Sequence, residues 1–74
     1  MKLKKIEKRI LKLVAKNKTY AEISKITKYS LSGASYYIRN LFNKYNVDNR
    51  MSLVLKAIKA GDIDITDIEG IENE

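Results

Sequence analysis

The sequence contains no cysteine, no histidine and no proline, and it has three glycines in 74 residues. Without cysteine the chain has neither a disulfide framework nor a thiolate metal site, and without histidine it also lacks zinc sites and histidine-based catalysis. The scarcity of proline and glycine disfavours a turn-rich β fold, because turns need these residues. With 45% hydrophobic residues, the chain is expected to form a compact helical domain that its core stabilises.

Long hydrophobic runs are also absent. No segment approaches the ~20 apolar residues of a membrane span, and the basic start of the chain is not followed by the ~7–15 apolar residues of a signal peptide. The protein is therefore expected in the cytoplasm, and its length allows one small domain. We find no nucleophile–base pair, phosphate-binding loop or metal cluster, so we expect no enzyme, no cofactor, no metal and no small-molecule ligand.

Charge is segregated along the chain. Residues 1–61 contain all 15 basic residues and three acidic ones, which is a net +12, whereas residues 62–74 contain six acidic and no basic residues, a net −6. The basic part indicates a polyanionic partner bound through counterion release, although a merely soluble lysine-rich protein would have the same composition. The acidic tail either competes with phosphate for this basic surface or extends a dimer contact of the preceding helix through Ile63 and Ile65.

Apolar periodicity predicts a first helix from Leu3 to near Asn17. Its inward stripe has spacings of three and four residues, with Leu11 broadening it. The stripe consists of Leu3, Ile6, Ile10, Leu13 and Val14. Lysines and one arginine occupy the opposite side. A helix lying on a membrane surface has the same pattern, but here the periodicity resumes three more times, which indicates a folded domain.

Two further helices follow. Thr19 and Glu22 have the spacing of a capping box, which predicts a short second helix with Ile23 and Ile26 facing inward. Ser30 or Ser32 can cap a third helix over residues 31–45. Its apolar face consists of Ala34, Tyr37, Ile38, Leu41, Phe42 and Tyr45. We expect the two tyrosines in the core with solvated hydroxyls. The opposite face is polar and nearly free of acidic residues.

A fourth helix is expected to begin near Arg50, capped by Asp48 or Asn49, and to end at Gly61. Val47 is the apolar residue of the preceding connector. The inward set is Leu53, Val54, Ala57 and Ile58, and the apolar surface is extended by Met51, Leu55 and Ala60. Such a wide apolar surface indicates two neighbours, the second being another copy of the chain, unless these residues complete a shallow core. The tail after this helix is expected to be extended or disordered.

Residues 19–45 combine a short helix, a tight turn and a longer helix, which is the helix-turn-helix arrangement. In this arrangement the second helix enters the major groove of DNA, because a groove ~12 Å wide admits one α-helix. The first helix crosses above it and contacts phosphates. Spacing alone is a moderate signal, since other small helical bundles share it.

Several segments resemble the LuxR/GerE-type (NarL/FixJ) helix-turn-helix domains. Residues 10–15 (ILKLVA) resemble the pattern vL-x-Lva, residues 19–24 (TYAEIS) resemble S-N-K-E-I-A, and residues 40–47 (NLFNKYNV) resemble N-I-x-x-K-L-x-V. The match continues without a gap to Gly61. The resemblance implies an all-α, four-helix DNA-binding domain over residues 1–61, with a three-helix core and a dimerisation helix, followed by the acidic tail 62–74. A chain of this length is most similar to the small GerE-like form, a sequence-specific transcriptional regulator that binds double-stranded DNA as a homodimer.

The sequence departs from this family pattern within the recognition helix. Gly33 and Ser35 stand where the family usually has threonine and lysine, so the base preference of relatives does not transfer. The candidate base or groove contacts are Ser32, Ser35, Tyr36 and Arg39. The candidate phosphate contacts are Thr19, Tyr20, Lys28, Asn40 and Lys44. The candidate dimer interface is Met51, Leu55, Ile58 and Ala60.

Alternatives to these roles remain at this level. The polar face of residues 31–45 is also compatible with a merely solvated surface, and Tyr20 and Tyr36 with ordinary surface aromatics. A protein-interaction module of the same fold, with weak or no DNA binding, is the alternative function, because the usual readout residues are altered. Salt dependence separates the two functions, since only DNA binding predicts a steep loss of affinity with salt.

Overall fold

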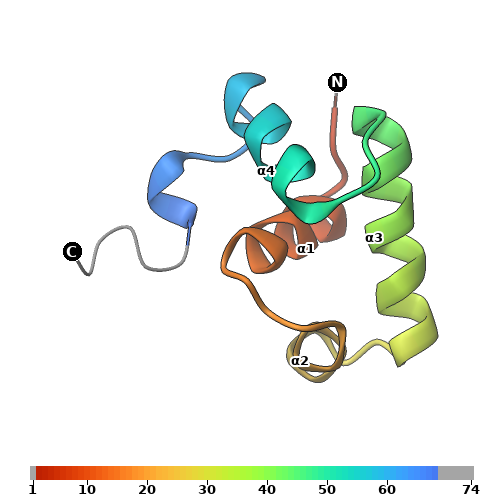
Figure 1. The fold of residues 1–74 in the computed structure, drawn as a ribbon. Helices are drawn as coiled ribbons and strands as arrows, with labels where there is room; N and C mark the ends of the chain where they lie inside the picture. The colour runs from red at the N-terminus through yellow and green to blue at the C-terminus, as the bar shows by residue number, and fades with distance from the viewer. Residues whose placement is uncertain (1, 69–74) are drawn as a thin grey trace.

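The computed structural model describes residues 2–68. Within this range the chain forms four α-helices, one 3-10 turn and no strand. The helices are α1 (Lys5–Ala15), α2 (Tyr20–Thr27), α3 (Leu31–Tyr45) and α4 (Arg50–Lys59), and the 3-10 turn is Ile65–Asp67. Figure 1 shows α1 near the centre, with α3 along one side, α2 below and α4 above. The expected all-α, four-helix fold is confirmed.

The helix starts follow from side-chain caps. Thr19 accepts a hydrogen bond from the Glu22 N–H (3.1 Å) and its own N–H donates to the Glu22 carboxylate (2.8 Å), which confirms the capping box. Ser30 caps α3 and Asn49 caps α4, each accepting from the backbone N–H three residues further on. Of the alternative caps considered above, these two are therefore the ones that the chain uses.

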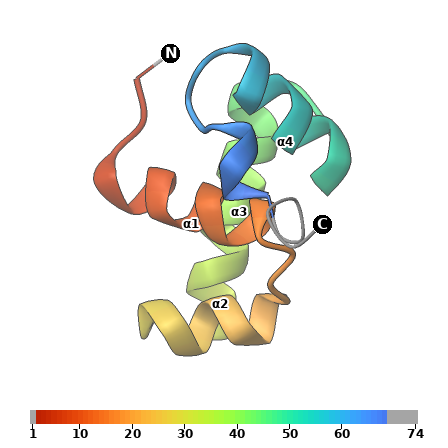
Figure 2. The same ribbon diagram turned by 90° about the vertical axis from the view of Figure 1, so that its left-hand side faces the viewer.

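Positive φ angles redirect the chain after each helix. The residues are Asn17 (63°), Lys28 (65°), Asn46 (55°) and Gly61 (80°). At Lys28 the left-handed residue lies directly between α2 and α3, and three residues, 28–30, complete this connection. The turn of the helix-turn-helix is therefore tight, and it sets the relative direction of the two helices (Figure 2).

The core lies where α1 packs against all three other helices. Its fully buried large side chains come from every helix and are Ile10, Leu11, Ile23, Ile38, Leu41 and Leu53. The inward stripe of α1 differs in part from the expectation. Leu3, Ile6 and Leu13 are only half-buried and Glu7 is buried, whereas Leu11, which was expected to broaden the stripe, is fully buried. The stripe is rotated because α1 has neighbours on more than one side.

The inward pair of α2 also differs from the expectation. Ile26 is 40% exposed, and Thr27 is buried in its place. Residues 23 and 27 lie one helical turn apart on the same face, whereas residue 26 lies ~100° away from residue 27 around the helix. The buried Thr27 hydroxyl donates to the Ile23 carbonyl (2.7 Å), so its burial leaves no unpaired polar group.

The expectation of an extended or disordered tail is wrong for residues 62–68, which we call the extension. Gly61 turns the chain, Ile63 enters the core at 6% exposure, and Asp64 caps the 3-10 turn. The Tyr45 hydroxyl, expected to be solvated, donates to the Asp62 carboxylate (2.5 Å). Burial raises the pKa of Tyr45 above its ordinary value of 10, and this hydrogen bond raises it further. Residues 69–74 of the tail lie outside the described range.

No helix within residues 2–68 has the length and apolar content that a membrane crossing requires. No group of three or more acidic side chains within the same range is arranged so that it could hold a metal ion.

Candidate nucleic-acid interface

The outer face of α3 carries the four expected groove contacts. Ser32, Tyr36 and Arg39 are exposed and Ser35 is half-buried, while the opposite side of the helix packs into the core. Tyr36 is the largest side chain among them and is 55% exposed. Because α3 contains no acidic residue, its outer face offers hydroxyl and guanidinium donors without a carboxylate that would repel phosphate.

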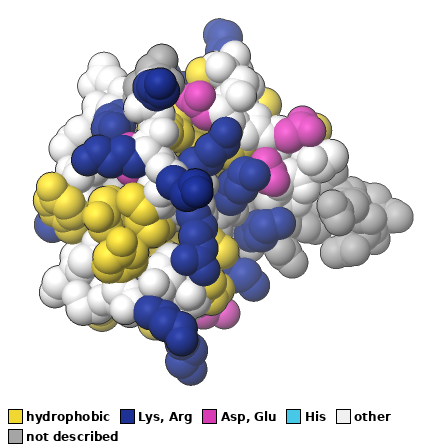
Figure 3. Space-filling model, turned by 180° about the vertical axis from the view of Figure 1, so that it is seen from behind, with side chains coloured by type: hydrophobic (Ala, Val, Ile, Leu, Met, Phe, Trp, Pro, Cys, Tyr) yellow, Lys and Arg dark blue, Asp and Glu magenta, His cyan; other side chains and the backbone are white. Residues whose placement is uncertain are grey.

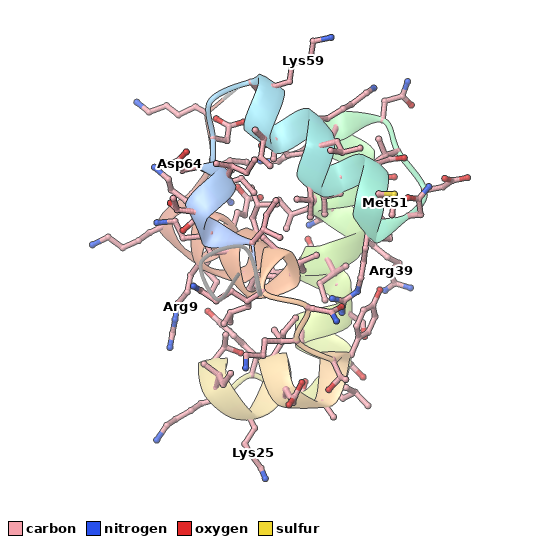
Figure 4. The ribbon with its side chains drawn as sticks, turned by 60° about the vertical axis from the view of Figure 1, so that its left-hand side comes forward. Arg9, Lys25, Arg39, Met51, Lys59 and Asp64 are labelled. Atoms are coloured by element: carbon pink, nitrogen blue, oxygen red, sulfur yellow. The ribbon has the colours of Figure 1, made fainter. Side chains whose placement is uncertain are left out.

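The labelled side chains in Figure 4 separate two sides of the molecule. Arg39 of α3 and Met51 of α4 project on one side, and Arg9 of α1 and Asp64 of the extension project on the other. The outer face of α3 and the start of α4 are thus presented together, whereas the extension points away from them.

The five expected phosphate contacts do not form one cluster. Thr19 and Tyr20 lie at the connection between α1 and α2, Lys28 lies in the turn before α3, and Asn40 and Lys44 lie on α3 itself. The side chains of Thr19, Tyr20 and Lys44 also have internal partners. The Thr19 hydroxyl caps α2, and the Tyr20 ring lies 5.7 Å below the Arg50 guanidinium. Lys28 is exposed.

Lys44 forms an ion pair with a buried carboxylate. Its Nζ lies 2.9 Å from Oε1 of Glu7, which is 3% exposed and also accepts from the Lys4 N–H at 2.8 Å. The backbone hydrogen bond from Lys4 lowers the pKa of Glu7 most, and the bond from Lys44 lowers it further. Glu7 is therefore ionised at neutral pH. Sequence reasoning missed this residue, because its partner lies 37 positions away.

Arg50 was expected only as the first residue of α4, but it joins three segments. Its guanidinium donates to the carbonyls of Lys18 (2.5 Å) and Val14 (3.4 Å) while lying over Tyr20. It thereby fastens the connection before α2 to the start of α4. In the sequence, Arg50 stands out only by its position next to Asn49, after the segment that resembles the family pattern. That position does not indicate which carbonyls its guanidinium contacts.

Three tyrosines pack together where α2 ends and α3 begins. The ring centroids of Tyr29 and Tyr37 are 5.3 Å apart at 56°, and those of Tyr36 and Tyr37 are 5.5 Å apart at 73°. The neighbouring Tyr29 hydroxyl raises the pKa of Tyr37 above its ordinary value of 10. The cluster connects the turn to the outer face of α3, a contact that helical periodicity did not reveal.

Comparison with known protein families decides the identity of the domain. The family model described as "Bacterial regulatory proteins, luxR family" matches residues 1–57, most of the chain. The chain belongs to the LuxR family. It is therefore a DNA-binding transcription-regulation domain rather than a member of an enzyme family. Searches of curated proteins and of solved structures gave no significant match.

In this LuxR-family domain, the basic residues lie largely outside α3. Lys5, Lys8, Arg9 and Lys12 of α1 are all exposed. Figure 3 shows Lys and Arg side chains in a band beside a group of hydrophobic side chains on the face seen from behind. Positive charge and the outer face of α3 are thus largely separate features of the same domain.

The family match ends at residue 57, within α4. The four expected dimer-interface residues differ in their exposure. Met51 and Leu55 are 73% and 60% exposed and border a groove of about 370 Å³ that Ile68 of the extension also borders. Ile58 instead packs against the core. Ala60 is exposed and follows the last residue of α4. Met51 and Leu55 are therefore the two that form an exposed apolar surface along this groove.

Proposed function

We propose that this LuxR-family domain binds duplex DNA sequence-specifically as a homodimer, with α3 in the major groove. The observation that carries the proposal is the exposed, acid-free outer face of α3, which the core and the tight turn hold rigidly. A groove ~12 Å wide admits one such helix, and polar side chains on its first half then reach base edges. The proposal therefore assigns specificity to α3.

The residues take different roles in this complex. Ser32, Ser35 and Tyr36 contact base edges, and Arg39 reaches a base or a phosphate. The phosphate contacts are Thr19, Tyr20, Lys28, Asn40 and Lys44. An ammonium group has three donors, so Lys44 can retain its bond to Glu7 while another donor faces a phosphate.

The homodimer is proposed to form through Met51 and Leu55, with Ile58 and Ala60 at the border of the interface. Two such exposed apolar side chains one helical turn apart are well suited to pack against the same pair of a second copy. A two-fold axis there would place the two recognition helices about one turn of DNA apart, ~34 Å, on a near-palindromic site. Sedimentation of the wild type and of Leu55→Glu tests this, because only the variant is expected to remain monomeric at micromolar concentration.

A salt titration tests DNA binding. The protein is first used to select sites from a random duplex library, and its affinity for the enriched duplex is then measured across salt concentrations. DNA binding predicts that log K falls linearly with log salt, by ~0.9 for each phosphate contact. Absence of enrichment together with no retention on duplex at low salt contradicts the proposal.

One observation favours the alternative function, a protein-interaction module with weak DNA binding. Arg39 is the sole basic residue on the outer face of α3 that carries the groove contacts, since Lys44 is paired with Glu7. A module of this kind predicts weak duplex binding with little salt dependence. The same titration therefore decides between the two functions.

A further inference from the structure

We propose that Tyr36 reads thymine methyl groups in the major groove, and that Tyr37 and Tyr29 are positioning residues that hold its ring for this contact. This inference rests on the proposed function. The cluster of Tyr29, Tyr36 and Tyr37 carries it, because it joins a half-buried ring to an exposed one on the outer face of α3.

In this cluster the rings of Tyr29 and Tyr36 each contact the ring of Tyr37. Tyr37 is half-buried and packs against the core, so its ring has a fixed place. Tyr29, which is 40% exposed, closes against one side of it. Tyr36 meets it edge-to-face at 73°. Edge-to-face aromatic pairs are favoured electrostatically, so the exposed Tyr36 ring has one preferred orientation before DNA arrives.

Gly33 lies beside Tyr29 and the cap of α3. It lies one helical turn before Tyr37, and side chains on a helix lean toward its N-terminus. A Cβ atom at residue 33 would lie 3.3 Å from Ser30 Oγ and 3.5 Å from Tyr29 Cβ. The branched threonine of the family pattern would crowd the turn further. The departure from the family pattern at Gly33 thus accompanies the aromatic cluster.

The chemistry of the outer face favours thymine as the target. Ser32 and Ser35 are short donors that bond several base edges, so they discriminate weakly. The ring of Tyr36 is the largest apolar surface among the groove contacts. In the major groove the thymine C5-methyl is the apolar group that distinguishes A·T from G·C pairs. A preoriented ring at this position therefore favours A·T pairs by covering that methyl.

Replacing thymine with deoxyuridine in the enriched duplex tests the inference, because it removes the methyl alone. Wild type is expected to bind about fourfold more weakly for each contacted methyl, which corresponds to about 0.8 kcal/mol per buried carbon. Tyr36→Ala is expected to bind both duplexes equally. Leu31→Ala is the matched control, since Leu31 is similarly exposed (54%) on the same helix but outside the cluster; it should keep the fourfold ratio.

The positioning residues are tested by the ratio of the affinities for the thymine and deoxyuridine duplexes. A general loss of stability does not change this ratio. Tyr37→Phe keeps the ring and should keep the ratio, whereas Tyr37→Leu and the more exposed Tyr29→Ala should reduce it toward one. An unchanged ratio in Tyr29→Ala and Tyr37→Leu overturns the positioning role. Equal binding of both duplexes by wild type, or an undiminished ratio in Tyr36→Ala, overturns the thymine contact. Both outcomes leave the salt-dependent binding of the proposed function intact, whereas a protein without any duplex binding fails on both.

Discussion

The outer face of α1 is strongly basic, whereas the outer face of α3 is nearly neutral. Lys5, Lys8, Arg9 and Lys12 are exposed on α1, and Arg39 is the basic residue among the groove contacts of α3. Surface charge attracts a polyanion over distances comparable to the Debye length, ~8–10 Å, whereas base readout requires contact. Under the proposed function we therefore expect α1 to contribute mainly to steering and general affinity, and α3 to sequence preference.

The acidic extension does not neutralise α1 through ion pairs. Among residues 2–68 the one salt bridge is that between Lys44 and Glu7. Asp62 accepts from Tyr45, and Asp64 and Asp67 cap the 3-10 turn. These carboxylates therefore stabilise the extension itself. The idea that the tail competes with phosphate stays a prediction, and its test by truncation after Gly61 would also remove the buried Ile63.

Removing the ion pair that joins Glu7 of α1 to Lys44 of α3 should have the largest effect. Glu7→Ala removes the ion pair with Lys44 and the acceptor for the Lys4 N–H. We expect a loss of ~2 kcal/mol in the free energy of unfolding, below the ~3–5 kcal/mol of a fully buried pair, because Lys44 can be rehydrated. Urea unfolding followed by circular dichroism measures this. Glu22→Ala, which removes a similar but exposed capping carboxylate, should cost less; equal losses would contradict the role of burial.

Removing one positive charge from α3 or from α1 tests the comparison between the two helices directly. Arg39→Ala should weaken binding to the enriched duplex about tenfold and relax its sequence preference, because a base contact is worth ~1–3 kcal/mol. Lys5→Ala should weaken binding to all duplexes alike and reduce the salt slope by about one if it contacts a phosphate. Fluorescence anisotropy with specific and random duplexes distinguishes the two. A uniform effect of Arg39→Ala would assign Arg39 to a phosphate and would contradict its role in base readout.

The turn before α3 allows stability and binding to be separated. Lys28 has a φ of 65°, which costs a non-glycine residue ~1 kcal/mol. Lys28→Gly should therefore stabilise the domain by about 1 kcal/mol in thermal unfolding while weakening DNA binding, since a proposed phosphate contact is lost. Lys25→Gly, within the last turn of α2, should destabilise it, because glycine is a poorer helix former than lysine. A destabilised Lys28→Gly variant would refute the strain assigned to this turn.

The pH dependence of unfolding should show the smallest effects, one at each end of the range. The pKa of Glu7 is lowered in the folded state, so its contribution is complete above its ordinary value of 4.5 and is lost as the pH falls below it. The pKa of Tyr45 is raised, so its contribution is complete below 10 and is lost as the pH rises beyond it. Thermal unfolding across pH measures both. Glu7→Gln should flatten the acid limb and Tyr45→Phe the alkaline limb, each without altering the other.

Much of the fold was predictable because its signals are local. The capping box of Thr19 and Glu22, and the bounds of α3, Leu31–Tyr45, follow from caps and periodicity within one or two turns. The four candidate groove contacts share the outer face of α3 for the same reason. The exposed Ile26 was predicted wrongly, because only the packing of α2 against its neighbours decides which part of a broad apolar face is covered.

The sequence by itself determined the helices, the segregation of charge and the membership in a family of DNA-binding regulators, since each depends on spacing along the chain. The tertiary structure alone decided which distant groups meet. It buried Glu7 against Lys44, placed Arg50 over Tyr20 and folded Ile63 into the core. These contacts join residues that are far apart in sequence, so they form only when α1 packs against the other helices and one helix face meets another.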